Sequence, residues 1–170
     1  MKVAIGSDHT GVKHRKQVKA LLDSLGIESR EIGLDTEEAV DYPDIAYEVA
    51  MAVAERECDY GVIICGTGIG VGIVANKVPG VLAAVCHDEY SAVMSRRDDH
   101  ANVLCLGARE GSEADAVKLV DVWLKTAPEG GRHSRRVGKI LQIEHAVLAK
   151  WCWQNQASGN QLVEQPTSIS

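Results

Sequence analysis

The sequence contains no phenylalanine, and aromatic residues make up only 4% of its 170 residues. A buried core must therefore be aliphatic, built from Val, Ile, Leu and Ala. Cations are also in deficit, because 18 Lys and Arg stand against 24 Asp and Glu and leave a net charge of −6. This balance disfavours binding to nucleic acid, which requires a surplus of positive charge.

Long apolar runs are missing as well. No stretch approaches the roughly 20 residues of a membrane-spanning helix, and Val3-Ala4-Ile5 leads directly into polar residues, so no signal peptide is expected. The five cysteines are an odd number without a Cys-x-x-Cys pair, which disfavours a disulfide framework and a zinc finger. We expect a cytoplasmic protein with reduced thiols and neither membrane nor nucleic-acid partners.

The chain alternates short apolar runs with helix-length amphipathic stretches. Strands are expected over residues 3–5, 27–32, 60–64, 81–85 and 103–106. Helices are expected over about 11–25, from Asp41-Tyr42-Pro43-Asp44 onward, over 112–125 and over 133–149. Because the strands are nearly continuous apolar runs, both faces of the sheet should be covered. The sequence therefore predicts an α/β fold, a single doubly wound, Rossmann-like domain with a five-stranded parallel sheet and helices on both faces.

The expected domain covers residues 1–149 and leaves a tail over residues 150–170. This tail is rich in Gln, Asn and Ser and has no clear period. Segments of this composition bury too little apolar surface to fold alone. We therefore expect the tail to be flexible.

The strongest local motif is Cys65-Gly66-Thr67-Gly68-Ile69-Gly70-Val71-Gly72. Its alternating glycines allow backbone N–H groups to approach a ligand closely, and a helix beginning after them would add positive partial charge. This suits a carboxylate, a phosphate or a developing oxyanion. The motif matches neither Gly-x-Gly-x-x-Gly nor a Walker A loop, so dinucleotides and ATP are disfavoured. The alternative is a glycine-rich turn that only permits close packing of helix on sheet.

Residues suited to chemistry follow the predicted strands. Asp8 and His9 follow the first strand, Cys65 the third, His87-Asp88 the fourth and Arg109 the fifth. Because the carboxyl ends of parallel strands meet at one edge, these side chains should gather there. The amino end of a helix stabilises a thiolate, so Cys65 could act as a base or nucleophile. It could equally be a buried structural cysteine.

A basic cluster is the second motif that suggests a ligand-binding site. Arg132 and Arg136 are four residues apart and would share one face of a helix. Two guanidinium groups on one face can hold a phosphate by paired hydrogen bonds. A solvated basic turn is the alternative.

Several motifs together resemble those of ribose-5-phosphate isomerase type B, a family that also includes galactose-6-phosphate isomerase subunits. The resemblance runs from residue 1 to about 149, in order and with compatible spacing. The motifs that carry it are Gly6-Ser7-Asp8-His9, Asp41-Tyr42-Pro43-Asp44, Cys65 to Gly70, Ala75-Asn76-Lys77-Val78-Pro79-Gly80 and Gly130-Gly131-Arg132-His133 with Arg136-Val137.

The resemblance implies an aldose–ketose isomerase that uses neither a metal nor another cofactor. The substrate would be a small sugar phosphate, with ribose 5-phosphate and ribulose 5-phosphate as the leading pair. The assembly would be a homodimer or tetramer with the active site between subunits. Chain length and stereochemistry of the sugar stay open at this stage.

The same resemblance implies roles for single residues. Cys65 matches the base that moves a proton between C1 and C2 of the sugar, and Thr67 is its hydroxyl neighbour. The N–H groups of Gly66, Gly68, Ile69 and Gly70 match the hole for the enediolate oxygen. Asp8 matches a residue that helps to open the furanose ring. The family's phosphate and substrate contacts correspond to His9, Arg109, Arg132 and Arg136.

One segment departs from the family pattern. The family commonly has His-Asn-Asn or His-Asn-Asp after Ser-Arg-x, and the His acts as the acid in ring opening. Here Asp98 and Asp99 stand at the first two of these positions, and His100 follows. His100 could reach the ring oxygen after a local shift, and an imidazole is in general a better acid for this step than a carboxyl group. Alternatively, Asp98 could be the acid, or the substrate could differ.

Two competing functions are weaker. A module of the same fold could bind a phosphorylated sugar without converting it, and the Asp98-Asp99 substitution supports this alternative. A small nucleotide-binding domain is disfavoured because the corresponding fingerprints are missing.

Overall fold

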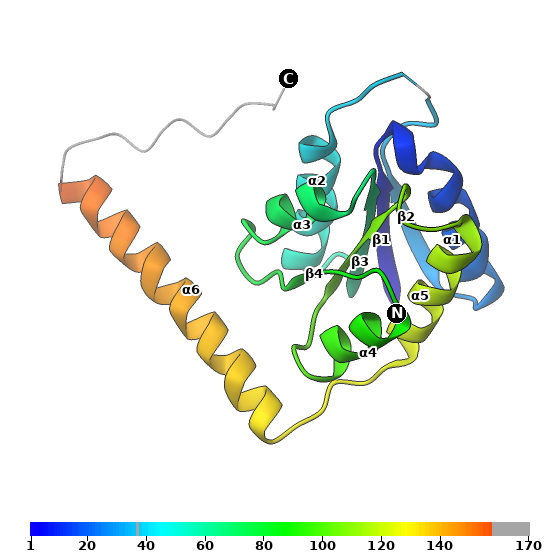
Figure 1. Cartoon of the computed structure of the whole chain (residues 1–170). Helices are drawn as coiled ribbons and strands as arrows, with labels where there is room; N and C mark the ends of the chain where they lie inside the picture. Colours follow the sequence, from blue (N-terminus) through cyan, green and yellow to red (C-terminus); the bar gives the residue numbers. More distant parts are fainter. Residues whose placement is uncertain (37, 158–170) are drawn as a thin grey trace.

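A five-stranded parallel sheet forms the centre of the molecule (Figure 1). The computed structural model describes residues 1–36 and 38–157. The strands are β1 (Lys2–Ser7), β2 (Glu28–Ile32), β3 (Tyr60–Cys65), β4 (Ala83–Val85) and β5 (Val103–Gly107). Their order is β2-β1-β3-β5-β4, and every neighbouring pair is parallel. The predicted doubly wound α/β fold is confirmed.

The three central strands are apolar because helices cover both of their faces. Val3, Ile5, Val62, Ile64 and Leu104 point to one face and join one hydrophobic cluster. Their neighbours in sequence point to the other face and join a second cluster. The edge strand β2 differs, because its first four residues, Glu-Ser-Arg-Glu, are wholly or partly exposed.

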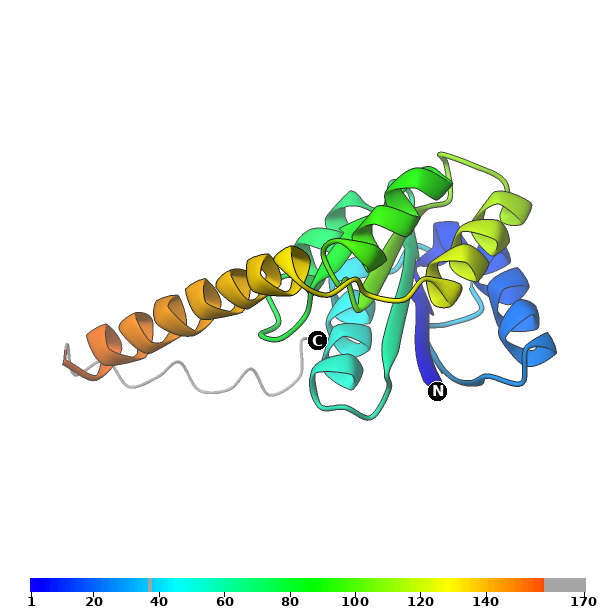
Figure 2. The same cartoon turned by 90° about the horizontal axis from the view of Figure 1, so that it is seen from below.

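Two layers of helix enclose the sheet. The layer on one face contains α2 (Tyr42–Ala54) and α3 (Ile69–Ala75). The other face is covered by α1 (Val12–Ser24), α4 (Glu89–Arg97) and α5 (Glu113–Lys125), and a 3-10 turn, η1 (His9–Gly11), leads into α1. Figures 1 and 2 show the two layers from different sides. Gly26, just after α1, has a φ of +67° and ends that helix as the sequence predicts.

Helix α4 was missing from the predicted elements. Its sequence, EYSAVMSRR, has no apolar stripe, and an arginine occupies part of its buried face. The Arg96 guanidinium lies 4.5 Å from the ring centre of Tyr60 and 4.9 Å from that of Trp123. It also donates to the Ala101 carbonyl. A cation thus occupies a position where a hydrophobic residue is expected. For this reason the hydrophobic periodicity of the sequence does not indicate the helix.

Trp123 anchors this side of the core. Its side chain is fully buried, its indole N–H donates to Ser95 Oγ at 3.2 Å, and its ring meets Tyr60 edge-on. We expect Trp123→Ala to lower the free energy of unfolding by about 3–5 kcal/mol, since it leaves a large cavity. Urea denaturation measures the change. Trp153→Ala is the control, because this tryptophan is 69% exposed, and its replacement should change stability by less than about 0.5 kcal/mol. Equal effects of the two substitutions would contradict this assignment.

The last helix, α6 (Arg132–Ala157), projects away from the domain (Figures 1 and 2). It extends beyond the predicted helix end at residue 149, so residues 150–157 of the expected tail are helical. The remainder of that segment, 158–170, lies outside the described residues. The helix carries a row of exposed apolar side chains, Ile140, Ile143 and Val147, at helical spacing. The helices described in the structure include none that is long and apolar enough to cross a membrane.

Candidate active site

The carboxyl ends of β1, β3 and β5 bring Asp8, Cys65 and Arg109 together, as predicted. They line one pocket of about 400 Å³. The complete lining is Asp8, His9, Thr10, Tyr42, Cys65, Gly66, Thr67, Ile69, Gly70 and Arg109. A thiol, a carboxylate, an imidazole and a guanidinium therefore face one small space.

Cys65 is the last residue of β3 and is only 5% exposed. Its carbonyl accepts from the Ala108 amide at 2.7 Å, which ties the strand end to the β5 loop. Its sulfur accepts a hydrogen bond from the Gly68 amide at 3.2 Å. An amide donor stabilises negative charge on sulfur. Cys65 thus lines the pocket and also belongs to the buried cluster beneath α2 and α3.

The glycine loop turns sharply after Cys65 and leads into α3, a helix that the sequence analysis named only as a condition for anion binding. Gly68 has a φ of +74°, which places it in the left-handed region that favours glycine. The first intrahelical bond runs from the Gly72 amide to the Gly68 carbonyl. The amides that precede it, including that of Gly70, have no acceptor inside the helix. They are the natural donors for an anion in the pocket.

Tyr42 is a pocket residue that the sequence analysis did not assign. It begins α2, next to Pro43, and its ring packs against Gly70. A Cβ added at Gly70 would lie 2.7 Å from the ring, so a larger residue at this position would displace the Tyr42 side chain. The Asp-Tyr-Pro-Asp motif was noticed as a helix start. The sequence does not show that the start of α2 packs against the glycine loop, and this contact is what places Tyr42 in the pocket.

Hydrogen bonds fix the two polar residues after β1. Asp8 Oδ1 accepts from the Thr10 amide at 2.9 Å and from the Thr10 hydroxyl at 2.6 Å. His9 Nδ1 accepts from the Val40 amide at 3.3 Å, which leaves Nε2 to carry the proton of the neutral ring. Both side chains are therefore oriented before any ligand binds.

Three other cysteines are structural. Cys58, Cys86 and Cys105 are all buried. Burial raises the pKa of each thiol and keeps it protonated. For Cys86, hydrogen bonds from Ser95 and Ser91 oppose this effect.

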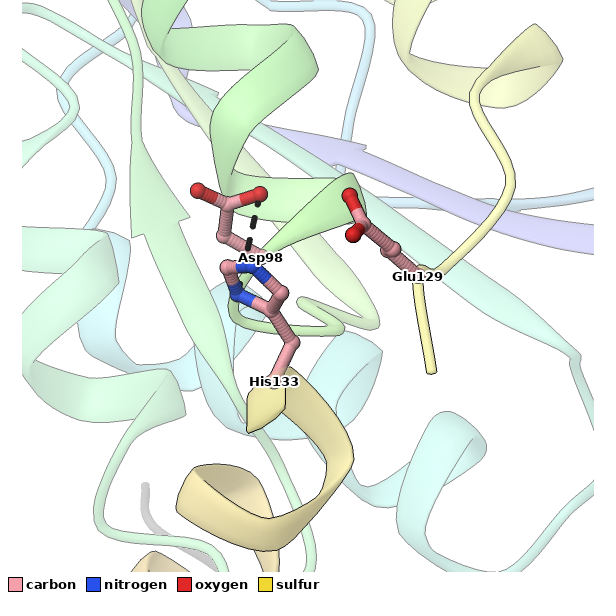
Figure 3. Close-up of side chains that lie close together, drawn as sticks. All are labelled: Asp98, Glu129 and His133. Carbon is pink, nitrogen blue, oxygen red and sulfur yellow. Dashed lines mark ion pairs between the residues drawn. The ribbon is translucent and has the colours of Figure 1, made fainter. Parts of the chain in front are cut away.

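A second polar cluster lies where α4 meets the start of α6 (Figure 3). Asp98 Oδ1 accepts from Arg97 Nε at 2.8 Å and lies 3.7 Å from His133 Nδ1. Glu129 Oε2 lies 3.7 Å from Arg97 Nε. Arg97 therefore pairs with both carboxylates, and its hydrogen bond is the main cause of the lowered pKa of Asp98.

The other candidate site residues near Asp98 lie in the same region, at the junction of α4 and α6. His100 has a φ of +54°, and its Nε2 lies 2.8 Å from the Glu129 carbonyl oxygen. Arg132 Nε donates to His133 Nε2 at 3.0 Å, and His133 is buried. The side chains of Asp99 and Arg136 are exposed.

These residues do not meet Cys65 within one chain. Helix α4 begins at the carboxyl edge of the sheet, runs back and ends beside the start of β5. Asp98, Asp99 and His100 therefore lie at the amino edge, opposite the thiol, and α6 begins next to them. The sequence analysis assigned none of these residues to the edge that holds Cys65, and the resemblance implied a site between subunits. The reversal of α4, which the sequence analysis missed, accounts for their place at the amino edge.

Asp98, Glu129 and His133 are also the residues best placed to hold a metal ion among those described. One ligand atom from each lies within 4.8 Å of the others. However, the Arg97 guanidinium already lies against both carboxylates. A cation would have to compete with this arginine.

His87 and Asp88 lie at the carboxyl edge but face a different hollow, of about 290 Å³, between α4 and α5. Asp88 caps α4 by accepting from the Ser91 amide, and Ser112 and Asp115 cap α5 in the same way. Lys118, which also lines this hollow, pairs with Glu89. These caps and this ion pair commit Asp88, Ser112, Asp115 and Lys118 to the fold, and the Cys65 pocket is the candidate active site.

The parallel sheet, the pocket at its carboxyl edge and the cysteine–glycine loop define a sugar-phosphate isomerase of the α/β class. The chain belongs to the ribose/galactose isomerase family, whose model matches residues 3–140. The predicted family and its aldose–ketose isomerase activity are thereby confirmed.

Two relatives illustrate the range of the family. The chain is 44% identical over 143 residues to ribose-5-phosphate isomerase B of Escherichia coli, covering 84% of this chain and 96% of that protein. It is 38% identical over 146 residues to D-erythrulose-4-phosphate isomerase of Pectobacterium atrosepticum, covering 85% and 96%.

Solved structures of ribose-5-phosphate isomerase B are similar to this chain in sequence and in fold. Ribose-5-phosphate isomerase B of Clostridium thermocellum is 48% identical with a TM-score of 0.84, covering 86% of this chain and 99% of that one. The enzyme of Mycoplasma genitalium with bound ribulose-5-phosphate is 42% identical with a TM-score of 0.82, covering 85% and 96%.

Proposed function

We propose that this protein interconverts ribose 5-phosphate and ribulose 5-phosphate by enediolate proton transfer, with Cys65 as the base. The observation that carries this proposal is the Cys65 sulfur in the pocket, 3.2 Å from the Gly68 amide. The relative from Mycoplasma genitalium, with ribulose-5-phosphate bound, supports the pentose phosphate pair. The relative named for a four-carbon sugar leaves chain length to be tested.

The thiolate removes the proton from C2 of the open-chain aldose. The electrons of the C2–H bond form a C1–C2 double bond, and the carbonyl electrons move to O1, which becomes an oxyanion. The Thr67 hydroxyl, which belongs to the same pocket lining, passes the O2 proton to O1, and the thiol then returns its proton to C1. A positioned base contributes about 10²–10⁴-fold.

Backbone amides of the glycine loop stabilise the oxyanion. The amides of Gly66 and Gly70 are the donors in this proposal, because those of Gly68 and Ile69 already donate to the Cys65 sulfur and the Thr67 hydroxyl. The loss of one such donor typically costs about 10²–10³-fold. Asp8 is a carboxylate acceptor suited to take the O1 proton of a closed sugar ring. Arg109 and His9 offer donors to the anionic end of the substrate.

A second copy of the chain completes the site in this proposal. Arg132 and Arg136 suit a phosphate, but they lie at the edge opposite Cys65. The exposed row on α6 and the exposed Ile69 beside the pocket are surfaces that a partner would cover. A homodimer or tetramer, in which α6 of one chain reaches the pocket of another, brings both halves together.

A direct assay tests the activity. The full chain is incubated with ribose 5-phosphate, and ribulose 5-phosphate is followed by NMR. Product should form up to the equilibrium ratio from either side. Tight binding measured by calorimetry without any product would instead identify a sugar-phosphate binding module.

Metal removal gives a further prediction. Treatment with EDTA followed by desalting should leave kcat unchanged, because base and oxyanion donors all come from the chain. The comparison is an untreated sample carried through the same desalting. A loss of activity that added Zn²⁺ restores would contradict the proposed mechanism.

A further inference from the structure

The two arginines assigned to the substrate phosphate are held differently at the start of α6. Arg132 is exposed, yet its Nε donates to Nε2 of the buried His133 at 3.0 Å. This bond engages Nε and leaves the N–H groups of both terminal nitrogens for an anion. Arg136, one turn further along, is exposed, and its side chain has no such bond to another described residue. Arg132 alone is thus oriented by a buried partner.

The bond to Arg132 fixes where the His133 ring carries its proton. An arginine cannot accept a hydrogen bond, so Nε2 is the acceptor and has no proton. The proton of the neutral ring is then on Nδ1, which lies 3.7 Å from Asp98 Oδ1 (Figure 3). A ring with its proton on Nε2, or with protons on both nitrogens, would offer Arg132 no acceptor.

The charge on Asp98 favours this arrangement. Arg97 Nε donates to Asp98 Oδ1 at 2.8 Å, and the same oxygen faces His133. The hydrogen bond from Arg97 is the main cause of the lowered pKa of Asp98, so this side chain is a carboxylate and a poor proton donor at neutral pH. A carboxylate beside Nδ1 attracts an N–H there and repels a lone pair, as outer partners of functional histidines commonly do.

We propose that Asp98 is a positioning residue of the phosphate site, which holds His133 in the tautomer that accepts from Arg132 and thereby orients the Arg132 guanidinium. This task differs from that of an acid in ring opening. All three side chains belong to one chain, at the junction of α4 and α6, so the unit is formed before a second chain meets it. The inference rests on the proposed function, in which Arg132 binds the substrate phosphate.

Two substitutions of Asp98 separate positioning from acid catalysis. In Asp98→Ala, KM for ribose 5-phosphate and Ki for inorganic phosphate should both rise about 10-fold with kcat within about twofold, because ordering a free arginine on binding costs about this much. Asp98→Asn keeps an oxygen that can accept from both Arg97 and His133 but cannot act as an acid. It should therefore recover most of the loss in KM. Circular dichroism checks that each variant is folded.

The same substitution in two arginine backgrounds tests the path through Arg132. In Arg132→Ala, the further change Asp98→Ala should alter KM by less than about twofold, because the side chain that Asp98 orients is gone. In Arg136→Ala, the matched control, it should retain its effect of about 10-fold. A purely structural role of Asp98 would give the same factor in both backgrounds.

Three outcomes would count against these proposals. An equal effect of Asp98→Ala on KM in the two backgrounds would overturn the inference. A loss of kcat of about 10²-fold or more in Asp98→Asn would also overturn it, since that is the size of a typical acid contribution. Both results leave the proposed function standing. Failure of the wild type to convert ribose 5-phosphate would instead overturn the proposed function itself.

Discussion

Replacement of Cys65 by alanine is expected to lower kcat by about 10³-fold while the protein stays folded, because a positioned base contributes about 10²–10⁴-fold. The sulfur is the only group at the end of β3 that can take a proton from C2 in the proposed mechanism. The substitution removes one heavy atom at the rim of the core, so the parallel sheet should persist. Isomerisation of ribose 5-phosphate by purified protein measures kcat, and far-ultraviolet circular dichroism reports the fold.

Cys105→Ala is the matched control for this prediction. Cys105 lies on the neighbouring strand β5, paired with Ile63 of β3, and it is fully buried with its thiol protonated. Its replacement should cost some stability and leave kcat within about twofold of the original value, since buried structural thiols are inert. Full activity of Cys65→Ala would remove the cysteine from the mechanism.

A mixture of two inactive variants is expected to regain about a quarter of the original activity, if two chains share each site. One variant is Cys65→Ala, and the other carries Arg132→Ala with Arg136→Ala. After co-refolding, half of the dimers contain one chain of each kind. Each mixed dimer has one site with both defects and one intact site, which accounts for the quarter.

The control mixture combines Cys65→Ala with Arg109→Ala. Both residues line the same pocket of one chain, so a mixed dimer contains no intact site. This mixture should remain inactive. Recovery in the first mixture alone supports a shared site, whereas no recovery in either would place the whole site within one chain.

Much of the fold could be predicted because its signals are local. The central strands are nearly continuous apolar runs, which only a sheet covered on both faces requires. Gly26 and the glycines after Cys65 mark chain reversals, and the structure has positive φ angles at Gly26 and Gly68. The pocket at the carboxyl edge follows from strand direction alone.

The remaining features of the fold and of the candidate site depend on contacts between distant residues, which no local sequence pattern encodes. Helix α4 buries Arg96 against two aromatic rings, so it lacks an apolar stripe. Without α4, the position of Asp98 at the opposite edge could not be deduced. Tyr42 enters the pocket only because the start of α2 packs on Gly70. The family resemblance indicated which residues matter, but not which of them meet in a single chain.

Hydrogen exchange with solvent tests the central claim most directly. Wild-type protein and Cys65→Ala are incubated with ribose 5-phosphate in deuterated water, and the products are examined by NMR. Transfer through a thiol that exchanges its proton with solvent between the two steps predicts deuterium at C1 of ribulose 5-phosphate with the wild type, and neither product nor label with the variant. Ribulose 5-phosphate carrying deuterium at C1 formed by the variant as fast as by the wild type would contradict the account.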